Sequence, residues 1–468
     1  MNNANGNIEK SVNGSLSGRR VVVMGLGSFG GGVGVTRWLV AQGAIVAVTD
    51  SQSADKLSAA IKQLEDMPIA MALGGHPPSL LDSCDLLVVN PAVDKTHSDF
   101  YQLAMRRKIP ITTEMNLFLQ RCPAAIVGIT GSIGKSTTTA MIHLALSAIY
   151  EKRRLGRCWL GGNIGQSLLR DLPQISPQDM VILELSSFML EDTPWVAFSP
   201  HVAVVTNLVS NHLDRHGSME NYAHAKQNIL RFQKSADFAI LNAQDAQVRQ
   251  WGVFTPAKIL LYSSRDQPLL ELGVPGQHNQ TNAQAALAVV RAMALESDLD
   301  VALSALRGFT GLPHRLELAH SVLLPSGKKV QWFNDSKATT PESALTALEA
   351  FAPRSFVCIV GGHDKYADMC KFIEQLAGSA GGVLGIGNTG GAMVSRVAAS
   401  GQINSDRCLV ADTLENAMKI AHNWVQTCPE LQTILLSPAC ASYGLFTNYE
   451  QRGATFTALA RQFVPSPV

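Results

Sequence analysis

The sequence predicts an α/β protein of three domains, each built on a mainly parallel sheet with flanking helices. Short apolar runs rich in β-branched residues alternate with helical patterns along the chain, which is typical of doubly wound sheets. Glycine, asparagine, aspartate or serine tends to end each run, at the edge where open parallel sheets bind ligands. The runs fall into three series, and each series indicates one domain.

The predicted strands are short, continuous and apolar, as expected of strands buried on both faces of a sheet. They are 21–25, 44–50 and 85–90 in the first series, 124–130, 180–186, 201–208 and 238–243 in the second, and 355–362, 382–387 and 433–439 in the third. The expected domains are therefore 1–112, with a loose polar tail over 1–18, then 113–311 and 312–468.

The composition excludes several classes of protein. Of 468 residues, 46% are hydrophobic and 16% charged, which is enough to bury large cores. The net charge of +1 favours neither nucleic acid nor an anionic membrane as a partner. No apolar run is long enough to span a bilayer, the start of the chain lacks a signal-like apolar segment, and the eight cysteines form no C-x-x-C pair. We expect a cytoplasmic monomer with reduced thiols.

A first glycine-rich turn follows the first predicted strand. Gly25, Gly27 and Gly30 form a G-x-G-x-x-G pattern, and Asp50 ends the next strand about twenty residues on. The context is that of a Rossmann-like nucleotide site, in which backbone N–H groups at a helix start receive a diphosphate. A nicotinamide cofactor and a nucleotide-diphosphate substrate would both need this turn, and the pattern does not separate them.

A second glycine-rich segment, GITGSIGKSTTT over 128–139, lies between a predicted strand and a helical pattern. Its glycines let backbone N–H groups turn toward phosphate oxygens, Lys135 offers a charge, and Ser136 or Thr137 can reach Mg2+. The usual spacing would place a glycine at Ile129, whereas the glycines fall at 128 and 131. We therefore expect a phosphate loop of unusual spacing.

Eight further segments, taken in chain order, resemble the Mur ligases, the ATP-dependent amide-forming enzymes of peptidoglycan synthesis. They are GGNIG (161–165), ELSSF (184–188), HLDRHG (212–217), GQHNQTNAQAA (276–286), GLPHRLE (311–317), NDSKAT (334–339), SPACAS (437–442) and EQRG (450–453). The resemblance implies Rossmann-like first and third domains around a central P-loop ATPase-like domain. It is strongest to the branch that joins D-glutamate to UDP-N-acetylmuramoyl-L-alanine through an acyl phosphate.

The resemblance implies a metal centre beside the phosphate loop, with Mg2+ as the expected ion and Mn2+ as a substitute. Its expected ligands are Ser136, Glu184, His212 and Lys226, and the expected catalytic residues are Lys135, Glu184, His212 and Lys226. The family converts the lysine to a carbamate with CO2, which turns a repelling cation into an anion. Without the resemblance, Lys226 would be interpreted as a solvated helix lysine.

The resemblance also implies contacts to each substrate. Those to ATP are Gly131, Gly134, Lys135, Ser136, Thr137, Asn279, Asn282, Arg315 and Asp335. Those to the UDP-sugar are Gly27, Ser28, Phe29, Asp50, Ser51, Asn90 and Asn163. Those to glutamate, whose two carboxylates need cations and hydroxyl or amide donors, are Lys337, Thr339, Lys365, Ser442 and Tyr449.

The chain departs from the family pattern at several positions. Ile133 replaces an asparagine, so backbone amides and Lys135 must do most of the phosphate binding, and Asn211 and Met189 replace an aspartate and a glutamine. Tyr443 and Gly444 replace a leucine and an aspartate beside the glutamate segment. Alternatives to the D-glutamate reaction are an L-glutamate acceptor, another Mur or folylpolyglutamate-type ligase, a dehydrogenase based on residues 21–50, and a non-catalytic nucleotide-binding protein.

Overall fold

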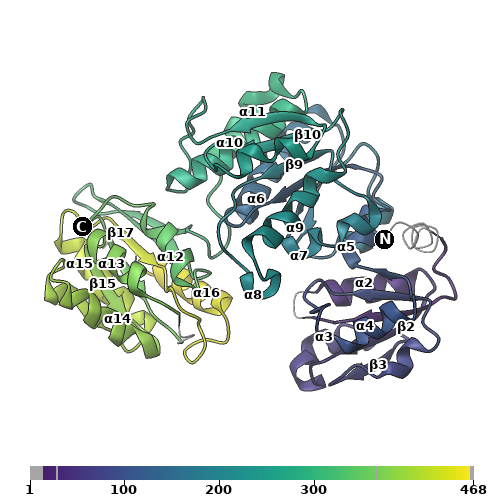
Figure 1. Cartoon of the computed structure of the whole chain (residues 1–468). Coiled ribbons are helices and arrows are strands. Elements are labelled where there is room, and N and C mark those ends of the chain that lie inside the picture. Colours follow the sequence, from purple (N-terminus) through teal and green to yellow (C-terminus); the bar gives the residue numbers. More distant parts are fainter. Residues whose placement is uncertain (1–13, 28–29, 364–366, 464–468) are drawn as a thin grey trace. The chain divides into compact units, whose positions relative to one another are not determined.

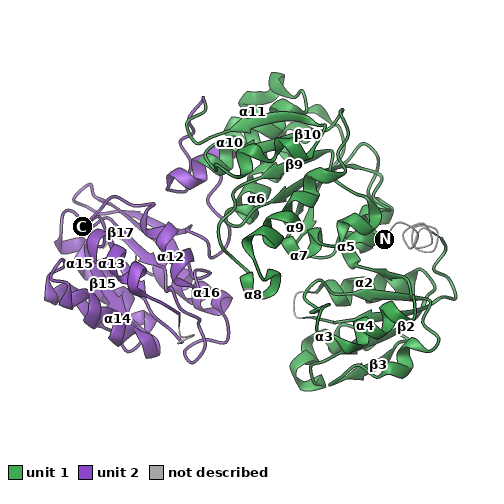
Figure 2. Ribbon diagram, viewed as in Figure 1, with its two compact units in different colours: residues 1–266, 281–305 green, residues 267–280, 306–468 purple. Residues whose placement is uncertain are grey.

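A computed structural model of the chain describes residues 14–27, 30–363 and 367–463. The chain divides into two compact units, which are coloured separately in Figure 2. Unit 1 comprises residues 1–266 and 281–305, and unit 2 comprises 267–280 and 306–468. Unit 1 contains two sheets and unit 2 contains one.

The N-terminal sheet of unit 1 has five parallel strands in the order β3-β2-β1-β4-β5. They are β1 (Arg20–Met24), β2 (Ile45–Asp50), β3 (Ala70–Leu73), β4 (Leu86–Val89) and β5 (Ile111–Thr112), with helices α2 (Gly31–Ala41), α3 (Ser58–Lys62) and α4 (Asp99–Arg106). Successive side chains of a strand point to opposite faces. Accordingly, Val21 and Val23 pack in one apolar cluster with α2, while Val22 and Met24 pack in another with α4.

The central sheet has six parallel strands in the order β11-β10-β9-β6-β8-β7. Its strands β9 and β10 are labelled in Figure 1. They are β6 (Ala125–Thr130), β7 (Cys158–Gly162), β8 (Met180–Glu184), β9 (Val202–Val205), β10 (Phe238–Asn242) and β11 (Lys258–Tyr262). The helices are α5 (Glu114–Leu119), α6 (Lys135–Arg153), α7 (Ser187–Leu190), α8 (Leu213–His216), α9 (Met219–Arg231) and α11 (Leu299–Arg307). The carboxyl ends of β6, β8 and β9 therefore meet at one edge, where the expected site residues follow them.

Helix α10 (Gln277–Ala292) belongs to both units, because its first residues are assigned to unit 2 and the remainder to unit 1. Short 3-10 helices complete the connections: Ala54–Leu57, Pro78–Leu81, Leu168–Gln174, Thr193–Val196, Val248–Phe254, Glu296–Asp298 and Ser405–Arg407.

The sheet of unit 2 has six strands in the order β12-β13-β17-β14-β15-β16. They are β12 (Glu317–Leu323), β13 (Lys329–Asn334), β14 (Phe356–Val360), β15 (Gly382–Gly385), β16 (Cys408–Val410) and β17 (Thr433–Leu436), and only the β12–β13 pair among them is antiparallel. Helices α12 (Pro341–Leu348), α13 (Cys370–Ser379) and α14 (Gly387–Ala399) pack in one apolar cluster. Helices α15 (Leu414–Thr427) and α16 (Tyr449–Ala460) pack in the other.

The predicted α/β class with mainly parallel sheets is confirmed, and each predicted strand overlaps an observed one. The sequence analysis missed β3, β5, β7, β11, β12, β13 and β16. Most of these lie at or next to a sheet edge, where a strand is short or carries polar residues and lacks a continuous apolar run. The domain boundaries near 112 and 311 stay predictions. None of the described helices is long and apolar enough to cross a membrane.

Candidate active site

The phosphate loop connects β6 to α6, as its sequence context predicts. Gly134 precedes α6 in the left-handed conformation, with φ of 82°. Gly131 has φ of 146°, and a Cβ at this position would stand 1.9 Å from the buried Thr206 hydroxyl oxygen. Both positions therefore require glycine for backbone and steric reasons. Ser136 is buried and Thr137 half-buried at the start of α6.

Side chains that follow β9 fix the tip of the loop. The Ile133 amide donates to the Asn207 carboxamide oxygen at 2.9 Å. The Ile133 carbonyl accepts from the Thr206 hydroxyl at 2.8 Å and from the Asn207 side-chain nitrogen at 2.9 Å. The Lys135 ammonium donates to the Ser132 carbonyl at 2.9 Å. The amide of Ile133 therefore already has an acceptor within the protein, and phosphate binding by the other loop amides stays a prediction.

Lys226 on α9 is buried, with 1% of its surface exposed, so the interpretation as a solvated lysine is wrong. Its Nζ donates to the Gly131 carbonyl at 2.8 Å and lies 4.5 Å from the centre of the Tyr222 ring. Burial, with a smaller contribution from the positive charge of Lys135, lowers the pKa of Lys226 to about 6, and the negative charge of Glu184 opposes the change. At neutral pH the folded protein therefore presents a largely neutral amine beside the phosphate loop.

Glu184 ends β8 and is 2% exposed. One carboxylate oxygen accepts from the Asn163 side chain at 2.8 Å. The other oxygen, Oε2, is buried and has no hydrogen-bond partner among the described residues. An orphaned buried carboxylate oxygen is costly unless a cation or donor completes it. It therefore fits a metal site. Asn163 orients this carboxylate, and its expected contact with the UDP-sugar stays a prediction.

His212 lies just before α8, in the left-handed region with φ of 53°, and is exposed. Its ring contacts Phe188 edge-on, with centroids 5.1 Å apart, and lies 6.4 Å from the Tyr222 ring. Tyr222 is thus a common neighbour of His212 and Lys226, two of the expected metal ligands. Tyr222 also donates to the Ser132 hydroxyl oxygen of the phosphate loop at 3.1 Å.

The side chains that could hold the metal ion differ in chemical type. Among the described residues, no group of three or more His, Cys, Asp or Glu side chains could hold a metal ion. Glu184 and His212 supply two such donors, the Ser136 hydroxyl is an oxygen ligand of the kind Mg2+ accepts, and a carbamate on Lys226 would add another oxygen. These residues fit Mg2+ only if Lys226 is modified, since an ammonium would repel the cation.

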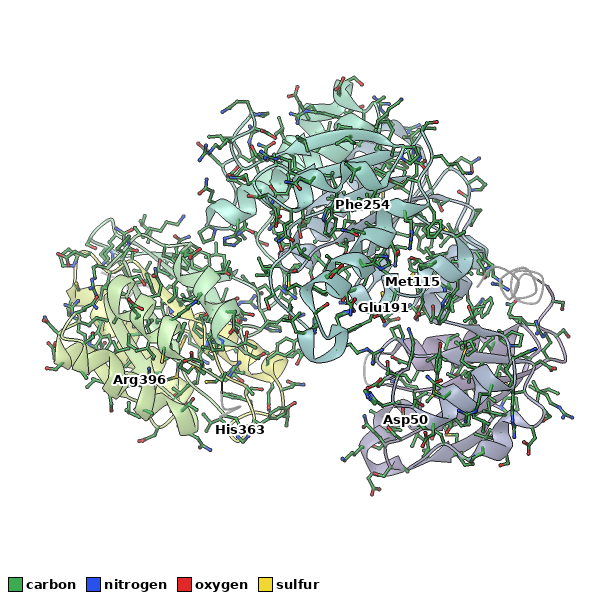
Figure 3. All side chains as sticks on the ribbon, in the orientation of Figure 1. Asp50, Met115, Glu191, Phe254, His363 and Arg396 are labelled. Atoms are coloured by element: carbon green, nitrogen blue, oxygen red, sulfur yellow. The ribbon has the colours of Figure 1, made fainter. Side chains whose placement is uncertain are left out.

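In the N-terminal sheet, the glycine-rich turn after β1 is fastened by Asp50, which ends β2 (Figure 3). The Asp50 carboxylate accepts from the Leu26 amide at 2.8 Å, from the Gly27 amide at 3.4 Å and from the Gln52 amide at 2.8 Å. In this structure Asp50 therefore shapes the loops around it through three backbone N–H groups.

Asn90, after β4, connects two loops of the same sheet. Its side chain donates to the Gly25 carbonyl at 3.4 Å and accepts from the Ala92 amide at 3.0 Å. The Asn90 Nδ2 also lies 2.9 Å from where a Cβ on Gly27 would stand. Ser51 is exposed beside them, and Ser28 and Phe29 lie outside the described residues.

The two asparagines of α10 differ in their contacts. Asn282 accepts from the Thr138 hydroxyl of α6 at 3.0 Å, and its Oδ1 lies 2.9 Å from a Cβ built on Gly134. It therefore borders the phosphate loop. Asn279 donates to the Pro275 carbonyl at 2.7 Å, within its own unit.

In unit 2, Asp335 follows β13 and is buried. It accepts from the Ser437 hydroxyl at 2.8 Å and from the Leu316 amide at 3.2 Å. Burial raises the pKa of Asp335 to about 7, although these hydrogen bonds and two arginines, Arg315 and Arg452, oppose the change. Both carboxylate oxygens are thus engaged inside the unit, where they tie the end of β17 to the GLPHRLE segment.

Two of the residues expected to bind glutamate lie together. The Lys337 ammonium stands 5.3 Å from the centre of the Tyr449 ring. Thr339 is half-buried two residues further on, Ser442 is buried in the SPACAS segment, and Lys365 lies outside the described residues.

The sequence analysis missed Arg452, a fully buried arginine in the EQRG segment. Its guanidinium donates to the Ser336 hydroxyl at 2.9 Å, to the Ser336 carbonyl at 2.7 Å and to the Cys440 carbonyl at 3.1 Å. It therefore joins the NDSKAT and SPACAS segments. It also missed Thr206 and Asn207, whose position directly after a predicted strand was an available signal.

Comparison with known proteins identifies the family of the chain. The Mur ligase MurD-like N-terminal domain model matches residues 19–113, and the Mur ligase middle domain model matches 129–271. A UDP-N-acetylmuramoylalanine–D-glutamate ligase of Roseiflexus sp. is 33% identical over 480 residues, covering 96% of this chain and 99% of the relative. One of Symbiobacterium thermophilum is 35% identical over 468 residues, covering 94% and 97%.

A solved structure shows the same fold. The chain matches a crystal structure of MurF from Acinetobacter baumannii with a TM-score of 0.56 and 16% identity, covering 95% of this chain and 93% of that one. The matches to the D-glutamate ligases of Roseiflexus and Symbiobacterium identify the branch of the family more closely, because they reach 33% and 35% identity over nearly the whole length of both chains. The chain belongs to the Mur ligase family, on its UDP-N-acetylmuramoylalanine–D-glutamate ligase branch.

Proposed function

We propose that this chain is an ATP-dependent ligase that joins D-glutamate to UDP-N-acetylmuramoyl-L-alanine, in the synthesis of peptidoglycan precursors. Its relatives on this branch carry that activity in their names and match the chain over nearly its whole length. The reaction needs a site for ATP phosphates and cations to neutralise moving charge, and it needs no protein nucleophile.

The observation that carries the proposal is the buried amine of Lys226 beside the phosphate loop. Lys226 is withdrawn from water, bonded to a glycine carbonyl of the loop and near Lys135, and its burial destabilises the folded state. A structural role alone would be served better by an apolar residue of similar volume. The cost is explained if the neutral amine reacts with CO2, because only an unprotonated amine can do so.

That reaction gives the site its missing anion. The Lys226 nitrogen forms a bond to the carbon of CO2, one C=O π pair moves onto oxygen, and the amine loses a proton to solvent. Ser136, Glu184, His212 and the carbamate would then hold Mg2+, which supplies charge neutralisation on phosphoryl oxygens when bound. The orphaned Oε2 of Glu184 supports this assignment.

The chain's own residues position and stabilise the reacting groups. The phosphate loop and Lys135 bind the terminal phosphates of ATP, whose γ-phosphoryl group passes to the carboxylate of the alanyl substrate. The amine of glutamate then attacks the acyl carbon, and phosphate leaves. Lys135 stabilises negative charge on the transferred group because its ammonium is held at the loop by the Ser132 carbonyl.

The substrate contacts remain part of the proposal. The turn after β1 and the loop after β4 would receive the UDP-sugar, with Asp50 and Asn90 shaping these loops. Asn279, Asn282 and Arg315 would contact ATP, and the Nε of Arg315 is buried with no hydrogen-bond partner among the described residues. Lys337, Thr339, Ser442 and Tyr449 would bind glutamate, with Arg452 fixing the segments that carry them.

The test is phosphate release from ATP and Mg2+ with UDP-N-acetylmuramoyl-L-alanine and D-glutamate, L-glutamate or no amino acid. We expect release that depends on both the nucleotide-sugar and D-glutamate. Phosphate release without the nucleotide-sugar would contradict a ligase. Phosphate release with L-glutamate but not with D-glutamate would show that L-glutamate is the amino acid the enzyme adds. The Lys226→Arg variant, which keeps the charge but cannot form the carbamate, should be inactive.

A further inference from the structure

The loop Asn90–Lys95, which follows β4, is fastened at two points to the segment between β8 and α9. The first fastening is Arg215 in α8. Its guanidinium donates to the Val93 carbonyl at 2.6 Å and reaches the carbonyls of Pro91 and Ala92 at 3.5 Å each. Three successive carbonyls of the loop thus converge on one cation, which fixes the direction of every peptide group between them.

The second fastening is an ion pair at the other end of the loop. The Lys95 ammonium contacts both oxygens of the Asp192 carboxylate, at 2.5 and 2.6 Å. The side chain of Asp192 is 2% exposed and that of Lys95 15%. Asn116 donates to the Asp192 carbonyl at 2.8 Å, and Lys95 lies 5.2 Å from the centre of the Trp195 ring. Because the pair is withdrawn from water, breaking it would strand a buried charge.

Glu191 links the two fastenings. Its carboxylate lies 3.9 Å from the Lys95 ammonium and 3.3 Å from Nδ1 of His216, a buried residue next to Arg215 in α8. His216 is held on its other side by the Ser187 hydroxyl at 3.0 Å. Glu191, labelled in Figure 3, directly follows α7. The loop, α7 and α8 therefore share one network of charged and polar side chains.

We propose that Lys95 and Arg215 are positioning residues for the nucleotide-sugar, which hold the loop Asn90–Lys95 in its binding conformation without touching the ligand. The inference rests on the proposed function, which assigns the UDP-sugar to this loop. The loop has no regular secondary structure. Besides Asn90 and its own turns, Gln102 of α4 holds it by donating to the Lys95 carbonyl at 2.8 Å, and Val93 packs against an apolar cluster. Arg215 and Asp192 connect it to the segment between β8 and α9. A loop ordered before binding spares the ligand the entropy of ordering it.

The network also connects the nucleotide-sugar loop to the segment that carries His212, an expected metal ligand. Arg215 lies three residues after His212, and its guanidinium stands 5.5 Å from the centre of the Phe188 ring, which His212 contacts edge-on. The cation that orders the nucleotide-sugar loop is thus carried on the same short segment as an expected metal ligand.

The test compares Arg215→Met with Arg215→Lys and with Arg231→Met, a matched control that removes an exposed arginine at the end of α9. For Arg215→Met we expect the KM for UDP-N-acetylmuramoyl-L-alanine to rise about tenfold, the loss expected from about 1.4 kcal/mol of ordering. The KM for ATP should stay within about twofold, since the phosphate loop is not contacted. Arg215→Lys should restore part of the loss, and Arg231→Met should match the wild type.

Lys95→Met is measured beside Lys95→Met/Asp192→Asn, because the single variant leaves a buried carboxylate without its cation and can fail to fold. The double variant should fold and show the same selective rise in KM. Amide hydrogen exchange over residues 90–95 should be faster in each loop variant than in the wild type, without any substrate present.

The outcomes separate the two claims. A wild-type protein that releases no phosphate with the nucleotide-sugar would refute the proposed function, whatever the exchange data show. An active wild type whose Arg215→Met variant keeps its KM for the nucleotide-sugar would refute the positioning role. Equal increases in the KM for ATP and for the nucleotide-sugar would also refute it, since they indicate a general loss of structure.

Discussion

Replacing Lys226 by methionine should abolish ligase activity and, in neutral buffer free of CO2, stabilise the protein. Burial lowers the pKa of Lys226 from its ordinary 10.5 to about 6. The folded protein therefore loses a proton that the unfolded chain keeps, and this cost is complete below pH 6 and vanishes as the pH approaches 10.5. At 1.36 kcal/mol per pKa unit, the cost is about 5 kcal/mol at pH 7 and about 2 kcal/mol at pH 9.

Methionine has a similar volume and no charge, but it leaves the Gly131 carbonyl without the donor that Lys226 supplies. That loss costs about 2 kcal/mol. The expected net effect is a gain of about 3 kcal/mol in the free energy of unfolding at pH 7, falling to about zero at pH 9. The pH dependence of the difference is the signature, because other titrating groups are common to both proteins.

The assay is guanidinium unfolding of both proteins at pH 7 and pH 9, with Lys62→Met, an exposed lysine of α3, as the control. Wild type should gain stability when bicarbonate is added, because carbamate formation occurs only in the folded site, and Lys226→Met should not. A difference between the proteins that is the same at both pH values would refute the buried-amine reasoning. Equal bicarbonate effects, or an active Lys226→Met protein, would refute the carbamate.

Three further substitutions test the site. Gly131→Ala should raise the KM for ATP strongly and lower the unfolding free energy by about 2–4 kcal/mol, since the new Cβ would overlap the Thr206 hydroxyl and the φ angle of residue 131 is positive. A variant with the melting curve and the KM of the wild type would contradict this. Ile133→Asn should change stability by less than about 0.5 kcal/mol, because Ile133 is 44% exposed. Its KM for ATP should fall about two- to fivefold if the new amide donates to phosphate, and titration calorimetry with ATP checks the affinity directly. Asp335→Asn should become more stable relative to wild type as the pH rises from 4 to 7, since burial raises the pKa of Asp335 to about 7 and ionisation in the folded state is costly. Urea unfolding at pH 5 and pH 8 measures the difference in unfolding free energy between the two proteins. A difference that is the same at both pH values would count against a buried ionisable carboxyl.

The sequence predicted the strands whose signal is local. The run over 201–208 contains β9 and that over 355–362 contains β14, because strands buried on both faces read as continuous apolar segments. Strand β13, Lys329–Asn334, was missed because lysine and glutamine interrupt it, and it pairs antiparallel with the edge strand β12. Such a strand takes its conformation from pairing partners that a short window of sequence does not contain.

The candidate site, too, was predictable where its signal is local in the sequence and not where it depends on distant residues. The phosphate loop could be placed because glycine, lysine and serine have a spacing with a physical meaning. The burial of Lys226 could not, since it depends on Gly131, ninety-five residues away in the sequence. The partners of Ile133 were equally remote, because Asn207 reaches it only through the pairing of β6 with β9.

The strand order of unit 2 bears on how this chain is made. Strand β17 is the last of its sheet in the sequence, yet it lies in the middle, between β13 and β14. During synthesis the hairpin β12–β13 and the ladder β14–β15–β16 can each form early, and Phe351 contacts both Phe333 and Phe356, but no strand pairs with both parts until residues 433–436 emerge. Arg452, which bonds Ser336 and Cys440, emerges later still. A growing chain therefore exposes two unpaired apolar strand edges until β17 emerges, and this exposure favours aggregation and chaperone binding at that stage.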